Sequence, residues 1–299
     1  MKWLHEVCIS QKDTNGNENV IARSVCDEAI SRDGIASPSA RNDSIEVFSG
    51  GRNVLSEVEM ERYRRQMLLH GFNREHQEML KESTVLIAGI GGLGGTAAMY
   101  LAVAGIGKMV FAHYGDLTLS NMNRQILMRH DWIGKSRVIQ GKKSIEEINP
   151  DVQVEIFNER TTPDNAERLL ENADIALSAR PNFQERRILN SACVKKGIPM
   201  VEAAMNGMEG YLFNVIPGVT PCLACVFHED NPEWEELGFP VLGAVSGMLG
   251  CLMAIETIKL LTGYGKPLIS QMLMYNTLNM EFKKLSIHRD AHCDVCGMS

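Results

Sequence analysis

The chain has 299 residues, of which 44% are hydrophobic and 22% are charged, values ordinary for a soluble globular protein. This length is sufficient to bury a full core, in one large α/β domain or in two smaller ones. The formal net charge of −7 argues against a general nucleic-acid-binding protein. The longest apolar stretch, Phe239–Ile255, is interrupted by glycines, so we expect a buried core element there and no membrane span.

The first 52 residues differ in composition from the rest of the chain, being rich in Ser, Asn, Asp, Gly and Arg. Such a segment buries too little apolar surface to offset chain entropy, so we expect poor order for residues 1–52 and a folded domain over residues 53–299. Alternatively, the segment recruits a peptide partner, or it is an adventitious extension and Met60 or a nearby codon is the true start. The beginning, Met1–Cys8, lacks the cationic and apolar regions of a secretion signal, and we expect a cytoplasmic protein.

A helix is predicted over Ser56–Leu69, where Ser56 is a suitable N-cap and Glu59 completes a capping box three positions later. The helix carries Arg62, Arg64 and Arg65. Arginines in such a position usually form a solvated face.

The next stretch, Thr84–Gly95, combines an apolar run with five glycines in seven positions. Val85–Ala88 has the composition of a strand buried on both faces, and Thr96–Gly105 that of a helix with small residues. Between them, Gly89, Gly91 and Gly94 fit the G-x-G-x-x-G pattern, in which missing Cβ atoms let the backbone approach a phosphate at the helix N-terminus. The pattern is weak on its own, because glycine clusters also serve as plain turns between a strand and a helix.

A second strand is predicted over Lys108–Ala112, and it is followed by His113 and Asp116 about twenty residues past the glycines. A nucleotide-binding sheet often has an acidic ribose ligand at this place. A polar turn follows over Leu119–Gln125, and then a basic segment with Lys135 and Arg137 that ends at the helix-terminating Pro150.

Strand and helix patterns then alternate, which predicts a mainly parallel, Rossmann-like α/β sheet with right-handed crossovers. Beyond Met205 successive strands surround one helix, Val245–Leu261, so we expect the sheet to gain antiparallel edges. The predicted elements are strand Val152–Phe157, helix Asp164–Asn172, strand Ile175–Ser178, helix Asn182–Lys196, strand Pro199–Ala203, strand Gly210–Val215 and a strand region over Gln271–Leu285.

Two C-x-x-C pairs, Cys222/Cys225 and Cys293/Cys296, predict a structural zinc knuckle, because each pair can place two thiolates on one cation about 2.3 Å away. Four sulfur ligands leave no open position for catalysis, and the metal would tie the C-terminal tail to the middle of the chain. The alternative is four free thiols or a redox pair, although neither pair stands where a thioredoxin-like motif would. The other four cysteines are interpreted as ordinary; they are Cys8, Cys26, Cys193 and Cys251.

As a set, these features resemble the ThiF/MoeB/HesA family, the bacterial relatives of ubiquitin-activating enzymes, over about residues 56–297. The motifs that carry the resemblance are Glu59–Gln66, the Gly89–Gly94 loop, Leu119–Gln125, Ile148–Pro150, Met208–Gly210, the two C-x-x-C pairs and Ile255–Lys259. The resemblance implies a single α/β domain, usually a homodimer. It also implies ATP-dependent adenylation of the C-terminal carboxylate of a small ubiquitin-like sulfur-carrier protein.

The resemblance assigns roles that the chemistry of the residues can sustain, since a carboxylate attacking the α-phosphate of ATP requires donors and cations. Arg65 would reach from one subunit to the triphosphate of the other. Arg124 and Asn121 would hold the phosphates and the sugar, and the amides of Gly91 and Gly92 would line the nucleotide. Arg137 stands where the family usually has a phosphate-binding lysine, and Lys135 could substitute in part.

The chain departs from the family pattern at three positions. His113 replaces the aspartate that holds the ATP ribose, a role that Asp116 could take. Pro181 replaces the aspartate that usually binds Mg²⁺, so any magnesium site would be atypical. Glu236 occupies the position of the thiol that takes part in sulfur transfer in some members.

These departures leave two further hypotheses. The enzyme could activate carboxylates of a ribosomally made precursor peptide, or the chain could be a degenerate nucleotide-binding scaffold without turnover. An NAD-dependent dehydrogenase is disfavoured, because the arginine-rich helix and the zinc knuckle have no part in hydride transfer. The sequence does not define the acceptor, nor whether a sulfur-transfer step follows on this chain.

Overall fold

The computed structural model describes residues 55–228 and 238–297. The chain divides into two units, Met1–Arg52 and Asn53–Ser299, and every described residue belongs to the second. The expectations for residues 1–52, including Cys8 and Cys26, and for Glu236 lie outside the described residues. The domain boundary therefore stays a prediction.

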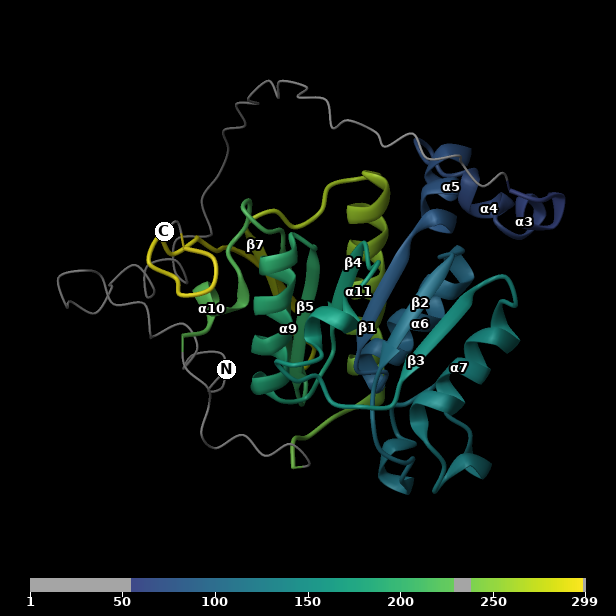
Figure 1. Ribbon diagram of the computed structural model, residues 1–299, viewed down its shortest axis with the longest axis horizontal. Helices are drawn as coiled ribbons and strands as arrows, with labels where there is room; N and C mark the ends of the chain where they lie inside the picture. Colours follow the sequence, from purple (N-terminus) through teal and green to yellow (C-terminus); the bar gives the residue numbers. More distant parts are fainter. Residues whose placement is uncertain (1–54, 229–237, 298–299) are drawn as a thin grey trace. The chain divides into compact units, whose positions relative to one another are not determined.

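The core of the second unit is an eight-stranded sheet with the order β3-β2-β1-β4-β5-β6-β7-β8 (Figure 1). The first five strands in this order are parallel, and β6, β7 and β8 are antiparallel to their neighbours. The predicted α/β sheet with an antiparallel C-terminal extension is thus confirmed. The strands are β1 Thr84–Ala88, β2 Lys108–Ala112, β3 Gln153–Phe157, β4 Ile175–Ser178, β5 Met200–Asn206, β6 Glu209–Val215, β7 Gln271–Asn276 and β8 Glu281–Ser286.

Helices cover both faces of the sheet, because the right-handed crossovers run in opposite directions from β1 to β3 and from β4 to β5. Helices α5, α6, α7 and α11 contact one another in series, while α8 and α10 contact α9. The helices are α3 Glu57–Arg62, α4 Arg64–Met67, α5 Arg74–Glu82, α6 Gly92–Ala104, α7 Arg137–Ile148, α8 Ala166–Leu169, α9 Phe183–Lys196, α10 Leu223–Val226 and α11 Gly243–Thr262, with 3-10 turns at Leu119–Asn121 and His130–Trp132.

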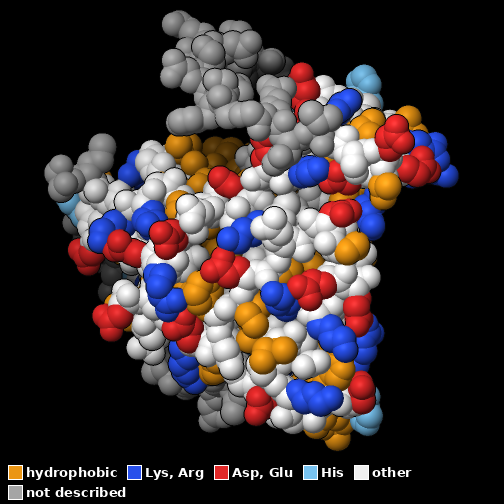
Figure 2. Space-filling model, turned by 45° about the vertical axis from the view of Figure 1, so that its right-hand side comes forward, with side chains coloured by type: hydrophobic (Ala, Val, Ile, Leu, Met, Phe, Trp, Pro, Cys, Tyr) orange, Lys and Arg blue, Asp and Glu red, His pale blue; other side chains and the backbone are white. Residues whose placement is uncertain are grey.

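The apolar helix α11 is the one helix among residues 55–228 and 238–297 that has the length and hydropathy to cross a membrane. It packs against α5, α6, β4, β5 and β6, and Leu249 and Met253 on it are fully buried. These contacts identify α11 as a core helix, as expected from its sequence. On the face of the molecule shown in Figure 2, acidic and basic side chains are interspersed.

The predicted helix Ser56–Leu69 is divided in two at Tyr63. The capping box of Ser56 and Glu59 is present, but Tyr63 leaves helical geometry at φ −96°, ψ 6°. Its ring is 3% exposed, and its hydroxyl accepts a hydrogen bond from Asn149 Nδ2 at 3.0 Å. Burial of this one ring therefore overrides the continuous helix that local propensity favours.

Other boundaries differ for local reasons. Helix α5 was not predicted, although Asn73 caps it by accepting from the backbone N–H of His76. Helix α6 starts at Gly92, inside the glycine cluster, and α8 keeps only Ala166–Leu169 of the predicted Asp164–Asn172.

The strand β8 forms one edge of the sheet and is solvent-exposed along most of its length. Phe282 on it is 45% exposed, and Glu281, Lys283 and Lys284 are exposed as well.

Candidate functional site

The glycine-rich loop lies where the strand order of the sheet reverses. The chain runs from β1 outward to β2 and β3 and then returns to β4 on the other side of β1. In open α/β sheets, ligands bind outside the carboxyl ends of the strands at such a switch point. The loop follows β1 here and leads directly into α6.

The three fingerprint glycines are required for different reasons. Gly89 has φ +98°, and a Cβ there would lie 2.6 Å from Ala179 O and 3.1 Å from Arg180 Cδ. A Cβ on Gly94 would overlap the carbonyl oxygen of Gly89, so this glycine lets α6 pack closely on the loop. By contrast, the nearest atom to a Cβ on Gly91 is Gln125 Nε2 at 3.6 Å. The space in front of Gly91 is open, as close approach of a phosphate requires.

The N-terminus of α6 adds backbone donors at the same place. The N-cap residue is Gly91, which has no side chain to cap the helix, so the first N–H groups of α6 receive no side-chain capping bond. These amides and the positive end of the helix dipole favour an anion.

Two arginines predicted for this site converge on it. Arg137, the first residue of α7, donates from Nη2 to Tyr114 O at 2.7 Å and from Nε to Gly115 O at 3.3 Å. Arg124 donates from Nη1 to Ser120 O at 2.9 Å and lies over the ring of Phe239. Burial lowers the pKa of Arg137, and the charges of Arg180 and Arg124 lower it further. The three guanidinium groups are therefore close enough to influence one another.

The remaining polar candidates lie on the rim. Asp116 and Lys135 are exposed, and Asp116 adds a favourable charge near Arg137. Asn121 Oδ1 accepts from the backbone N–H of Thr118 at 3.1 Å and thereby caps the 3-10 turn.

Arg65 does not join this cluster within one chain. The helices that precede β1 contact the far end of α6, where Gln66 Nε2 donates to Ala104 O at 3.1 Å. Since α6 has 13 residues, its two ends are about 20 Å apart at 1.5 Å per residue. Arg65 is exposed on α4 near the end of α6 that is remote from the glycine-rich loop (Figure 1).

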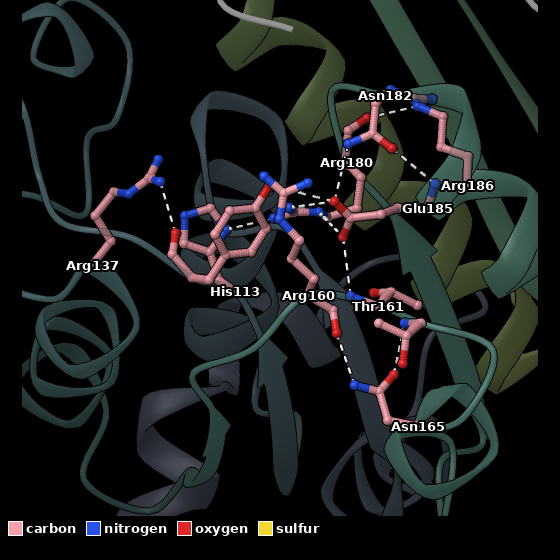
Figure 3. Close-up of polar contacts among 11 residues, drawn as sticks. His113, Arg137, Arg160, Thr161, Asn165, Arg180, Asn182, Glu185 and Arg186 are labelled. Atoms are coloured by element: carbon pink, nitrogen blue, oxygen red, sulfur yellow. Dashed lines mark hydrogen bonds and ion pairs between the residues drawn. The ribbon is translucent and has the colours of Figure 1, made fainter.

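A second group of residues at the carboxyl ends of β2 and β4 was only partly predicted (Figure 3). Arg180, just after β4, is buried and holds both oxygens of Glu185, with Nε–Oε2 and Nη2–Oε1 at 2.8 Å each. The guanidinium groups of Arg160 and Arg180 lie 4.3 and 4.4 Å from the centroid of the Tyr114 ring. His113 follows β2 and is 5% exposed. Sequence reasoning singled out His113 and Pro181 but missed Arg180 and Glu185, although Arg180 lies two residues past the predicted strand Ile175–Ser178.

Several buried polar atoms around the loop have no hydrogen-bond partner in the described part of the chain. They are His113 Nε2, Gln125 Oε1 and Ser246 Oγ, in residues that are at most 5% exposed. Ser246, in the first turn of α11, lies against Gly92, and Gln125 faces Gly91. Because unpaired buried polar groups are costly, these three atoms are candidates to bond a polar ligand.

Among residues 55–228 and 238–297, the acidic residues near the loop do not fit a magnesium ion held by the protein. Position 181 is proline, and both oxygens of Glu185 are bound by Arg180. Burial raises the pKa of Glu185, but the bonds from Arg180 outweigh this and keep it below its usual value. Asp116 is the carboxylate left near the arginines, and it is exposed.

The four cysteines of the C-x-x-C pairs come together as predicted. Their sulfur atoms all lie within 4.8 Å of one another, with Cys222–Cys293 at 3.7 Å, Cys222–Cys225 at 3.9 Å and Cys225–Cys296 at 3.3 Å. A tetrahedron with metal–sulfur bonds of about 2.3 Å has edges of about 3.8 Å, so the cluster fits zinc. Arg289 supports it by donating to Gly218 O and to Cys296 O. Cys193 is buried and Cys251 half-buried on helices, away from this cluster.

The switch-point loop, the helix N-terminus and the nearby arginines give this α/β protein a site with the geometry expected for an anionic ligand, and four cysteines that could hold a metal ion. The ThiF family model matches residues 63–295, and the chain belongs to this family.

Relatives and solved structures agree with this assignment. The chain is 55% identical over 243 residues to the vegetative protein HesA of Trichormus variabilis, covering 81% of this chain and 91% of that protein. It is 36% identical to the molybdopterin-synthase adenylyltransferase of Escherichia coli K12, covering 81% and 98%. The fold matches the crystal structure of E. coli MccB with MccA-N7isoASN at a TM-score of 0.72 and 22% identity, covering 79% of this chain and 75% of MccB. Family membership and the adenylyltransferase relatives support adenylyltransferase activity for this chain.

Proposed function

We propose that this protein uses ATP to adenylate the C-terminal carboxylate of a small ubiquitin-like sulfur-carrier protein. The observation that best supports ATP binding is the open space at Gly91, which lies next to the α6 N-terminus, Arg124 and Arg137. The carrier substrate is supported by two relatives: the molybdopterin-synthase adenylyltransferase and, at 34% identity, the sulfur carrier protein adenylyltransferase of Thermus thermophilus.

In the proposed reaction, a carboxylate oxygen of the carrier attacks the α-phosphorus of ATP. The bond from this phosphorus to the oxygen that bridges the α- and β-phosphates breaks, and pyrophosphate leaves with that electron pair. Negative charge grows on the phosphate oxygens during this step, so fixed cations and backbone donors accelerate it. No proton has to be removed from a carboxylate, which agrees with a site lined by arginines.

The residues take the following roles in this proposal. The amides at Gly91 and Gly92 approach the phosphates, and Arg124 and Arg137 neutralise them. Asn121 and the exposed Asp116 and Lys135 face the outer part of the nucleotide. Since the acids of the site do not fit a protein-held metal, Mg²⁺ would arrive with the phosphates of ATP and supply charge neutralisation there.

We also propose that the enzyme is a homodimer in which Arg65 serves the site of the other subunit. Arg65 lies about 20 Å from the loop of its own chain, as α6 spans that distance. Helices α6 and α11 expose Tyr100, Val103 and Ile255 at 47–50%, an apolar surface that a second copy could cover.

ATP–pyrophosphate exchange tests the proposed function. Carriers ending in Gly-Gly should stimulate incorporation of labelled pyrophosphate into ATP, and a carrier without its terminal glycines is the matched control. Stimulation by precursor peptides and not by carriers would favour the peptide-maturation hypothesis. ATP binding without exchange for any acceptor would favour the non-catalytic scaffold.

A further inference from the structure

The imidazole of His113 is fixed in one tautomer by its neighbour. Arg180 Nη1 lies 3.1 Å from His113 Nδ1, and a guanidinium can only donate. Nδ1 is therefore the acceptor, and the neutral ring carries its proton on Nε2. Burial, and then the charges of Arg137 and Arg180, hold the pKa of His113 well below its usual value, so the ring is neutral at physiological pH.

Arg180 is itself held from several sides, so the orientation of the ring is built into the fold. Its guanidinium is paired with Glu185, which also accepts from Asn182 Nδ2 at 3.0 Å and from the backbone N–H of Thr161 at 3.1 Å. The backbone oxygen of Arg180 accepts from Arg186 Nε at 2.6 Å. Two strand ends and the start of α9 thus position a single imidazole (Figure 3).

His113 follows the strand residue that is bonded to the glycine-rich loop. Gly89 N donates to Ala112 O at 2.9 Å, so the first glycine of the loop is bonded to the residue that precedes His113. His113 Nε2 is buried and has no partner among the residues of the structure that are described. A fixed N–H donor that lacks an acceptor in the protein points to an acceptor on the ligand.

In doubly wound sheets the end of the second strand faces the ribose, and a carboxylate there usually accepts hydrogen bonds from ribose hydroxyls. At this position the present chain offers a hydrogen-bond donor, the Nε2–H of His113, in place of an acceptor. We propose that His113 is a nucleotide-specificity residue that donates from Nε2–H to a ribose hydroxyl oxygen, and that Arg180 is the residue that positions it. This inference rests on the proposed function, since it concerns the same nucleotide. Asp116, three residues further along, is exposed on the rim and does not satisfy the buried donor.

Calorimetric titration of the full-length protein with ATP, 2′-deoxy-ATP and 3′-deoxy-ATP tests this proposal. His113→Asn keeps an acceptor for Arg180 close to the Nδ1 position but removes the donor at Nε2. His113→Gln is the matched variant, because its amide reaches the Nε2 position. Loss of one hydrogen bond is expected to weaken ATP binding to His113→Asn about five- to tenfold, with His113→Gln affected less. The wild type should lose a similar factor on one of the deoxy analogues, and His113→Asn should not distinguish that analogue from ATP.

Nitrogen-15 NMR of the imidazole provides a second measurement, since the proton should reside on Nε2 in the free wild type and the Nε2–H signal should shift when ATP binds. The proposal is overturned if His113→Asn binds ATP as tightly as the wild type, if it keeps full discrimination against both analogues, or if the proton resides on Nδ1. Variants that retain the wild-type melting temperature rule out misfolding as the cause. Failure of the wild type to bind ATP would instead overturn the proposed function together with this inference.

Discussion

The glycines of the loop give a prediction at the scale of single residues. Gly94→Ala should lower the melting temperature by several degrees, because the new Cβ overlaps the backbone oxygen of Gly89 and overpacking costs about 1–3 kcal/mol. Gly91→Ala should leave the melting temperature unchanged, since the nearest atom to its Cβ, Gln125 Nε2, lies at an ordinary contact distance of 3.6 Å, yet it should weaken ATP binding by filling the approach to the amides. Thermal melts and ATP titrations of the two variants measure both effects. Equal melting temperatures would show that the packing reason for Gly94 is wrong.

The neutral state of His113 makes stability depend on pH. The unfolded chain binds a proton at this residue near pH 6.5, while the folded protein, whose pKa is far lower, does not. The unfolded state then binds more protons below pH 6.5, so the free energy of unfolding should fall as the pH drops, by up to about 1.4 kcal/mol per pH unit from this residue. The free energy of unfolding, measured with denaturant between pH 5 and 7.5, should change less with pH for His113→Asn than for the wild type.

The matched control for that measurement is His130→Asn, which removes an exposed imidazole and should not reproduce the change. If the free energy of unfolding depends on pH equally in the wild type and in His113→Asn, the ring binds a proton in the folded state as readily as in the unfolded state.

At the scale of elements, the ends of a helix or strand were predicted correctly where the local sequence pattern and the tertiary environment favour the same structure. β2 and β4 have the predicted ends, because both are buried apolar runs bounded by polar residues. The helix around Tyr63 was predicted as continuous because its break depends on Asn149, 86 positions away.

The candidate site likewise contains residues that were predicted from the sequence and residues that were not. The glycines and the cysteine pairs are recognisable from their spacing, whereas Arg124 and Arg137 were assigned through the family resemblance, and the structure brings each of these sets together. The pair of Arg180 and Glu185 was not predicted, because its contact with His113 depends on the sheet order. In the folded protein β2 and β4 flank β1, and this brings His113 beside Arg180. Whether Arg65 takes part stays a prediction, since it would depend on a second chain.

The cysteine cluster gives a prediction about the C-terminal tail. We expect about one equivalent of zinc per chain, and Cys293→Ser or a strong chelator should lower the melting temperature while the remaining folded protein still binds ATP. The reason is that Ile287 is the one buried residue among residues 287–297, so the metal would supply much of the attachment of this segment.

Elemental analysis together with melts in chelator measures the role of the metal. Cys251→Ser is the matched control, as it removes a half-buried thiol outside the cluster. Less than about half an equivalent of metal would contradict the prediction for a site expected to be tight.

At the scale of the whole molecule, the proposed homodimer predicts that catalysis depends on two chains, because Arg65 lies near the end of α6 that is remote from the glycine-rich loop of its own chain. Arg65→Ala and Arg124→Ala should each reduce adenylation on the order of 10³-fold with no change in fold, as losses of arginine in phosphoryl chemistry commonly do. When the two variants are mixed and subunits exchange, a heterodimer has both lesions in one site and none in the other. Activity should return to about a quarter of the wild-type rate under random assortment.

A mixture that recovers no rate, under conditions where exchange is demonstrated, would place both arginines in the site of one subunit or outside catalysis. Either variant mixed with wild-type protein is the control, since such heterodimers show how one lesion per dimer affects the rate.

The exposed edge strand β8 has a consequence for solubility. An unpaired edge offers backbone N–H and C=O groups to any passing chain and invites strand-to-strand aggregation. Glu281, Lys283 and Lys284 carry charge along this edge, between Met280 and Leu285. Charged side chains on an edge strand are costly to desolvate, which disfavours the addition of a strand from a second copy. We therefore expect the antiparallel extension to end in water without starting a fibril.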